Sequence, residues 1–260
     1  MIFYFSGTGN SRHAALALAM SGEMVADIAA LMKEPSLPSF DLREGEAVGF
    51  VCPVYFGDLP LMMQEFMEQV TFNEVPSYIY AVFTCGGMSG LCREKAQQLL
   101  SGRGLDLHAA WEVHMVANYV VLYDIPSEEE QQKILQDAEM QLALIKDEVW
   151  ARNPHQLVIT DEARRLTEQM APMYAEAVKT HKFWIDDTCV GCGTCAARCP
   201  VQAITMLDGY PSWNTGKCQH CMCCIRCGAV EYGLTTHGRK RYTHPDLRKK
   251  KTADADAHCH

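Results

Sequence analysis

Nine of the 13 cysteines in this chain fall between residues 189 and 227, at spacings that suit metal-cluster chemistry. The first four follow the pattern C-x-x-C-x-x-C-x-x-x-C-P and are Cys189, Cys192, Cys195 and Cys199. Two residues between successive thiolates let one tight turn present both sulfurs to the same cluster. This run is typical of cysteines that bind [4Fe–4S] clusters, in which three hold one cluster and the fourth reaches a second.

A second run repeats the first three positions at Cys218, Cys221 and Cys224. Its fourth cysteine departs from the pattern, because residue 228 is a glycine and Cys227 comes one place early. Cys227 is the candidate ligand if the turn tightens, and Cys223 is a poorer substitute because it adjoins Cys224. If neither sulfur reaches, one cluster has only three thiolate ligands.

The symmetry of the two runs predicts how the sulfurs are shared. We expect cluster 1 to take Cys189, Cys192, Cys195 and Cys227, and cluster 2 to take Cys199, Cys218, Cys221 and Cys224. A zinc site would use two pairs of ligands, usually with a longer gap between the pairs. Disulfides are disfavoured, because the chain shows no secretory segment and cytosolic thiols stay reduced.

The composition indicates a folded chain with an uneven charge. Of the 260 residues 48% are apolar, which allows one medium domain and one small one. Residues 1–182 have 25 acidic and 13 basic side chains, whereas residues 183–260 have 7 acidic and 10 basic ones. Such an acidic surface attracts basic redox partner proteins and argues against nucleic acid. No apolar run is long enough to span a bilayer, so we expect a soluble, cytoplasmic protein. The oligomeric state is not indicated.

An anion site is predicted at the N-terminus. The apolar run Met1–Phe5 favours a buried strand, and the helical segment from Arg12 to Met20 follows it after a short loop. That loop is Ser6, Gly7, Thr8, Gly9, Asn10 and Ser11. Backbone N–H groups at a helix N-terminus, together with hydroxyl donors, bind phosphate. The loop resembles the flavodoxin phosphate loop, T/S-x-T-G-x-T/S, which binds the monophosphate of FMN.

Three further strands end in polar, aromatic or glycine-rich segments. We expect strands in 46–52, 78–85 and 106–115, each with a loop after it. The loop residues of interest are Pro53, Tyr55, Phe56, Gly57, Thr84, Gly86, Gly87, Asn118 and Tyr119. In open parallel sheets, ligands bind outside the carboxyl ends of the strands. The loops are therefore expected to converge on one pocket, in which the ring of Tyr55 or Phe56 lies against a flavin. The alternative is that these two aromatic side chains pack in the core of the domain.

The rest of the chain divides into segments. Ser127 and Glu130 form a capping box, which predicts a helix that continues to Trp150. We assign residues 1–150 to the first domain, 151–182 to a helical connecting arm, 183–242 to the cluster domain and 243–260 to a tail without fixed structure.

Taken together, IFYFSGTGNS, the PVYFG-LP segment and the tandem cysteine runs resemble the flavodoxin–ferredoxin fusion family called EFR family ferredoxin. The resemblance implies a flavodoxin-like, doubly wound α/β domain with a five-stranded parallel sheet, and a small α+β domain of the bacterial ferredoxin type. It also implies FMN and two [4Fe–4S] clusters as cofactors, and an anaerobic organism, since the family is found largely in anaerobes. FMN contacts carry over to Ser6, Thr8, Gly9, Asn10, Ser11, Tyr55, Phe56, Gly57, Thr84, Gly86, Gly87, Asn118 and Tyr119.

The hypothesis for function is electron transfer between FMN, the two clusters and external redox partners. FMN carries two electrons and each cluster one, so the protein would set position and potential. One alternative is a flavin-dependent reductase of a small substrate such as a quinone, fed through the clusters, although no catalytic acid or base stands out. Another is an empty flavodoxin-like scaffold that docks a partner. The donor, the acceptor, the potentials and the direction of flow are not specified by the sequence.

Overall fold

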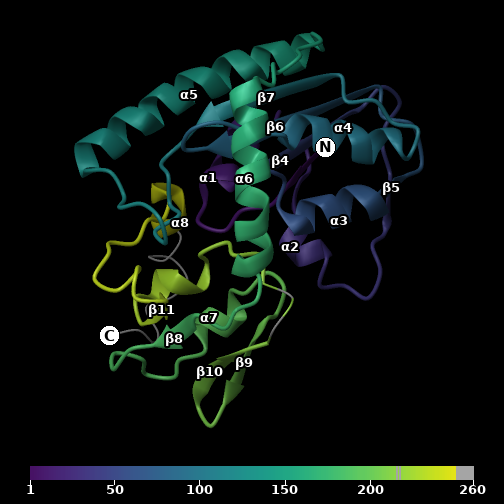
Figure 1. Ribbon diagram of the computed structural model, residues 1–260. Helices are drawn as coiled ribbons and strands as arrows, with labels where there is room; N and C mark the ends of the chain where they lie inside the picture. The colour runs from purple at the N-terminus through teal and green to yellow at the C-terminus, as the bar shows by residue number, and fades with distance from the viewer. Residues whose placement is uncertain (215, 217, 250–260) are drawn as a thin grey trace.

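The computed structural model, which describes residues 1–214, 216 and 218–249, has a large α/β part and a smaller part that holds the cysteine runs (Figure 1). The centre of the large part is a five-stranded sheet in the order β2-β1-β4-β6-β7. Its strands are β1 Ile2–Tyr4, β2 Val25–Asp27, β4 Ala47–Pro53, β6 Tyr78–Cys85 and β7 Ala109–His114. All four pairings are parallel. This strand order is that of the flavodoxin-like fold, so the expected fold class is confirmed.

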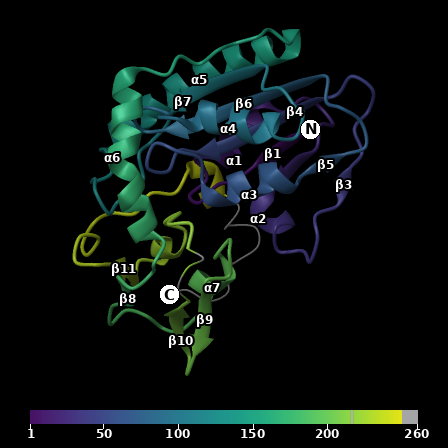
Figure 2. The ribbon, with the colours of Figure 1, turned by 45° about the vertical axis from the view of Figure 1, so that its right-hand side comes forward.

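Helices cover both faces of the sheet (Figure 2). Helices α1 Asn10–Leu18 and α5 Glu128–Ala151 bury apolar side chains against one face. Helices α2 Ile28–Leu31, α3 Leu61–Gln69 and α4 Cys92–Ser101 cover the other. Because both faces are covered, β6 is buried along its whole length and its sequence is almost continuously apolar. A short parallel pair, β3 Ser39–Phe40 and β5 Thr71–Phe72, lies outside the main sheet.

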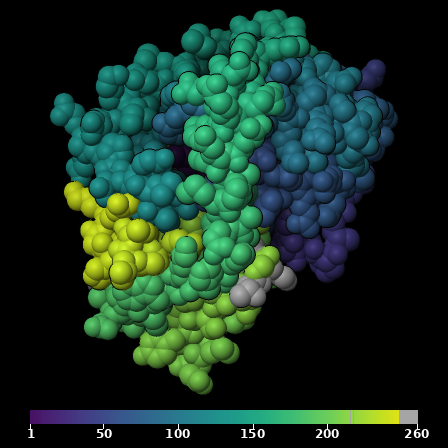
Figure 3. Space-filling model, in the orientation of Figure 1, coloured from purple at the N-terminus to yellow at the C-terminus, as the bar shows by residue number. Residues whose placement is uncertain are grey.

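The long helices begin at caps that the sequence encodes. Ser127 and Glu130 form the expected capping box at the start of α5. Thr160 caps α6 Asp161–Ala177, a helix within the segment expected to be a connecting arm. This helix crosses the front of the molecule from the large part to the small one (Figure 3). It packs against loops of the large part, so it does more than connect.

The small part consists of two antiparallel strand pairs and short helices. Strand β8 Phe183–Ile185 pairs with β11 Val230–Tyr232, and β9 Ile204–Leu207 pairs with β10 Tyr210–Trp213. The α-helical turn α7 Thr194–Ala197 lies within the first cysteine run, and the 3-10 turn η1 Cys224–Cys227 lies within the second.

The expectation for the tail is wrong for residues 243–249. Residues Pro245–Lys249 form helix α8, and His244 is only 4% exposed. The backbone N–H of His244 donates to the carbonyl of Thr8 at 2.9 Å, and the Tyr242 hydroxyl donates to Oδ1 of Asn10 at 2.9 Å. This segment therefore holds the loop after β1. Residues 250–260, the rest of the expected tail, lie outside the described residues. Within the described residues, every helix is too short or too polar to cross a membrane.

We predict that Gly49→Ala lowers the free energy of unfolding by about 1–3 kcal/mol, because it overpacks the sheet. A Cβ at Gly49 would lie 2.3 Å from Cζ of Tyr80, its neighbour on β6, and this ring is 1% exposed and cannot move away. The control is Gly102→Ala at the end of α4, where the nearest atoms are 3.5 Å away. Thermal unfolding should show a lower Tm for Gly49→Ala alone, and equal values for both variants would contradict this packing.

Candidate functional site

A cavity of about 430 Å³ lies at the carboxyl ends of the parallel strands. Its volume falls within the range of about 300–1,000 Å³ that is usual for cofactor sites. Thirteen of the fourteen residues proposed to contact FMN line it: Ser6, Thr8, Asn10, Ser11, Pro53, Tyr55, Phe56, Gly57, Thr84, Gly86, Gly87, Asn118 and Tyr119. The structure thus brings the separate loops together at one place. Gly9 is the exception, since a Cβ there would meet His244 and Leu247 instead.

The loop after β1 is fixed by hydrogen bonds to its neighbours. Ser6 Oγ accepts from the N–H of Gly9 at 3.1 Å, and Gly9 has a φ of 112° in the left-handed region. The hydroxyls of Ser11 and Thr84 are 2.7 Å apart, and the Asn118 amide donates to the Thr8 hydroxyl. The loops after β1, β6 and β7 are therefore held together around the cavity.

Aromatic side chains form one wall of the cavity. Phe56 stacks on Tyr174 of α6 with ring centroids 4.9 Å apart, and it meets Tyr119 edge-on at 5.3 Å. Phe56 and Gly57 have φ values of 54° and 78°, so the chain turns sharply at this point. Burial, with a smaller contribution from the nearby Cys221, raises the pKa of Tyr55 well above its usual value. Tyr55 is therefore a neutral phenol on the cavity wall.

Two elements line the cavity that the sequence did not lead us to expect. Helix α6 contributes Leu166, Thr167 and Met170, and the second cysteine run contributes His220, Cys221 and Met222. The Thr167 hydroxyl donates to the carbonyl of Gly57 at 3.2 Å, which ties α6 to the loop after β4. Local periodicity gives no signal for either contact, because each joins segments far apart in the chain.

His220 is a buried side chain at the boundary between this cavity and the cysteine runs. It is 2% exposed, and its Nδ1 lies 3.0 Å from the Tyr119 hydroxyl. Burial, and secondarily Lys182, lowers the pKa of His220 to about 4, so the ring is neutral at pH 7. Among the described residues nothing hydrogen-bonds its Nε2. With the Tyr119 hydroxyl donating to Nδ1, Nε2 carries the proton and lacks an acceptor.

The indole Nε1 of Trp213 is a second buried donor with no partner among the described residues. A buried donor left without an acceptor costs about 1–3 kcal/mol. Cofactors with acceptor atoms, such as cluster sulfides or a flavin ring, would supply what His220 and Trp213 lack. The residues present therefore fit the groups that the sequence suggests.

The cysteine thiols form two neighbouring groups. Burial raises the pKa of Cys195, and nearby Cys227 and Cys189 raise it further. Burial likewise raises the pKa of Cys224 well above its usual value, and Cys218, Cys223, Cys199 and, least of all, Cys195 add to this effect. The two cysteine runs therefore bring Cys195 close to Cys227 and Cys189, and Cys224 close to Cys218 and Cys199.

Cys227 and Cys223, the two candidates for the irregular ligand position, lie near different groups of cysteines. Cys227 is close to Cys195, in the group assigned to cluster 1. Cys223 is buried, and its Sγ lies 3.4 Å from the carbonyl of Arg198 and next to Cys221, in the group assigned to cluster 2. Cys227 therefore lies among the cysteines expected to hold cluster 1, and Cys223 among those expected to hold cluster 2.

Comparison with known proteins gives one matching family model, the 4Fe-4S binding domain, at residues 182–205. No curated protein matches the chain. Among solved structures, a putative flavoprotein of Bacteroides uniformis is 15% identical, with 52% of this chain and 94% of that chain covered and a TM-score of 0.35. A flavodoxin of Streptococcus pneumoniae is 17% identical (55% and 97% covered, TM-score 0.30). An NAD(P)H:quinone oxidoreductase of Methanothermobacter marburgensis is 14% identical (57% and 94% covered, TM-score 0.35).

These similarities are low, so the fold assignment depends on the strand order described above. The matched residues hold the first cysteine run, and the chain has a [4Fe–4S]-binding domain there. The protein thus joins a flavodoxin-like α/β domain to an iron–sulfur domain.

We predict that Cys227→Ser lowers the iron content from about eight per chain to between about four and seven, because it removes a ligand of cluster 1. Cys223→Ser is the matched control and should keep about eight irons. Iron and sulfide are counted after anaerobic purification. The reverse pattern, with iron lost only from Cys223→Ser, would exclude Cys227 as the ligand.

Proposed function

We propose that this protein transfers electrons between FMN, two [4Fe–4S] clusters and an external redox partner, and that it is a member of the EFR family ferredoxins. The observation that carries the proposal is the position of Cys221. This candidate ligand of cluster 2 lines the same cavity as the loops expected to hold FMN. FMN and cluster 2 would then lie on opposite sides of the wall that contains Cys221, which is the close arrangement that direct electron exchange requires.

The proposed FMN site uses hydroxyl, amide and backbone donors in place of a positive side chain. Thr8 and Ser11 are buried hydroxyls at the N-terminus of α1, where the helix dipole favours an anion. Phe56, Tyr55 and Tyr119 offer aromatic surfaces for the ring. When bound, FMN supplies two-electron chemistry, whereas each cluster carries one electron. The side chains bind the phosphate, orient the ring and keep water away.

The exposure of the cysteines suggests the order in which the three proposed cofactors lie between the protein surface and the cavity proposed for FMN. Cys192 and Cys227, assigned to cluster 1, are exposed. Cys199, assigned to cluster 2, is buried, and Cys221 faces the cavity. We therefore propose that a redox partner docks beside Cys192 and Cys227, the exposed residues that would hold cluster 1, and that Cys199 and Cys221 would hold cluster 2 between this surface and the FMN site. Apolar residues such as Ile204 and Ile225 surround the sulfurs and limit the access of water, which helps to set the potentials.

A second candidate function is reduction of a small substrate such as a quinone. The specific observation in its favour is that Leu122 and Tyr123, which line the cavity, are 44% and 57% exposed. These exposed apolar side chains offer a planar substrate a place beside the flavin. Steady-state turnover of a quinone by the cofactor-loaded protein would favour this function over that of a carrier.

We predict that Thr8→Val raises the Kd for FMN by about tenfold to hundredfold. The loss of a hydrogen bond to a charged phosphate is worth about 1.5–3 kcal/mol. Thr71→Val, an exposed position on β5, is the matched control and should bind FMN like the wild type. Quenching of flavin fluorescence gives both constants. Equal Kd values for the two variants would place the phosphate elsewhere.

We predict that Cys192→Ser and Cys221→Ser each slow the reduction of bound flavin by a reduced ferredoxin by about tenfold or more. A protein donor is too large to enter the cavity, so its electrons have to pass through the clusters. Stopped-flow absorbance measures the rate, and the flavin content of each variant is counted first. If either variant lacks its cluster and its flavin is still reduced at the wild-type rate, the path from the donor through the clusters to the flavin is refuted. Dithionite, which is small, serves as the control and should reduce the flavin in all forms.

A further inference from the structure

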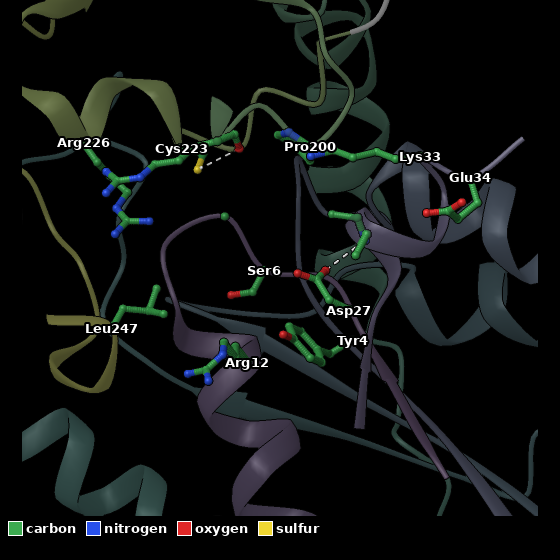
Figure 4. Close-up of a pocket in the computed structure, with 14 residues that line it drawn as sticks. Tyr4, Ser6, Arg12, Asp27, Lys33, Glu34, Pro200, Cys223, Arg226 and Leu247 are labelled. Carbon is green, nitrogen blue, oxygen red and sulfur yellow. Dashed lines mark hydrogen bonds between the residues drawn. The ribbon is translucent and has the colours of Figure 1, made fainter. Parts of the chain in front are cut away.

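A second cavity, of about 600 Å³, shares Ser6 and Gly7 with the cavity proposed for FMN, here called the flavin cavity. Figure 4 shows the residues that line this second cavity. One wall comes from the ends of β1 and β2, with Tyr4 and Asp27. The opposite wall comes from the two cysteine runs, with Arg198, Cys223 and Arg226. The cavity therefore exists only because the two parts of the molecule meet.

The lining of this cavity is positively charged in an acidic protein. Arg12, Lys33, Arg198 and Arg226 line it, against Asp27 and Glu34, whereas the whole chain has a net charge of −9. Among the residues that the structure describes, no carboxylate lies within ion-pair distance of these four cations. The three arginines are partly buried. Arg12 and Lys33 interact with Asp27 at longer range, and Arg198 and Arg226 interact with Cys223. The four cations still outnumber the two carboxylates of the lining, and such an excess of positive charge favours an anionic ligand.

The arginines suit phosphate in particular. A guanidinium group presents planar, paired donors that match two oxygens of one phosphate. Arg226 donates through Nε to the Thr243 hydroxyl at 3.0 Å, and its guanidinium also hydrogen-bonds the side chain of Cys223, so the group is fixed on the cavity wall. In Figure 4 Arg226 lies on the wall opposite Tyr4 and Asp27.

Asp27 gives a second recognition group on the same cavity. It is the last residue of β2, and one carboxylate oxygen accepts from the N–H of Ala29 at 2.9 Å as the cap of α2. The other oxygen points into the cavity (Figure 4). In open parallel sheets that bind dinucleotides, an acidic residue at this place after the first glycine-rich loop hydrogen-bonds ribose hydroxyls.

We propose that this cavity binds a nucleotide, with its phosphates on Arg12, Arg198 and Arg226 and its ribose on Asp27. The proposal goes beyond electron transfer and does not depend on it. A nucleotide here would touch Gly7, which also lines the flavin cavity, and Cys223, which lies next to Cys221. A bound nucleotide would therefore contact the wall that separates the proposed FMN from cluster 2.

The test is isothermal titration of the flavin-loaded, cluster-loaded protein with two probes, ADP and inorganic pyrophosphate. Loading with FMN keeps both probes out of the flavin cavity. We expect the wild type to bind both. Arg226→Gln should raise the Kd for both probes by about tenfold or more, since it removes a charged hydrogen bond. Arg165→Gln, an exposed position on α6, is the matched control and should change neither.

Asp27→Asn separates the two kinds of ligand. Asparagine caps a helix as well as aspartate does, so α2 should keep its start. We expect this variant to bind ADP more weakly than the wild type does, but to bind pyrophosphate with unchanged affinity. If Asp27→Asn leaves the affinity for ADP unchanged, the ribose contact is wrong and the proposal of a nucleotide is overturned. If neither probe binds the wild type, the site is refuted.

Arg226 lies within the second cysteine run, so its substitution needs a check on the clusters. Iron is counted for each variant before titration. If Arg226→Gln loses iron, Arg12→Gln replaces it, because Arg12 lies on α1 and away from the cysteines. Arg12→Gln is expected to weaken both probes, and unchanged binding in this variant with full iron would contradict the phosphate site.

Discussion

The close contact between Gly7 and Cys221 is the constraint on which the rest of the site depends. A Cβ at Gly7 would lie 2.2 Å from the carbonyl oxygen of Cys221, so only glycine lets the second cysteine run reach the loop after β1. This contact places a candidate cluster ligand on the wall of the cavity proposed for FMN. It also separates that cavity from the cationic one. Two sites with different chemistry thus share one short piece of backbone.

Hydrogen bonds from three other segments hold the two parts of the molecule in this relation. The side chain of Gln219 accepts from the N–H of Met62 at the start of α3 at 2.8 Å. Helix α6 joins the same region, since the Tyr174 hydroxyl accepts from the N–H of Leu61 at 3.2 Å. The C-terminal segment holds the opposite side through Tyr242 and Asn10. Each contact satisfies a polar group at the interface, which favours one fixed arrangement of the domains over a swinging arm.

The sequence predicted the positions of β1, β4, β6 and β7 and of the loops after them, because their signals are local, but it gave no range for β2. The apolar run at residues 78–85 corresponds to β6, and the capping box at Ser127 begins α5. The convergence of the loops on one cavity also followed, since parallel strands end at the same edge. The contact of Thr167 with Gly57 and the burial of His244 could not be predicted. Both depend on the docking of segments more than 100 residues apart, for which amphipathic periodicity contains no information.

The central claim is that FMN and cluster 2 occupy the two sides of the wall that contains Cys221. An anaerobic crystal structure of the purified protein, with anomalous scattering measured at the iron edge, tests it most directly. The account predicts an iron bonded to Sγ of Cys221 and flavin density in the cavity that this residue lines. Flavin density at another place, or a Cys221 without iron beside a fully loaded cluster 1, would contradict it.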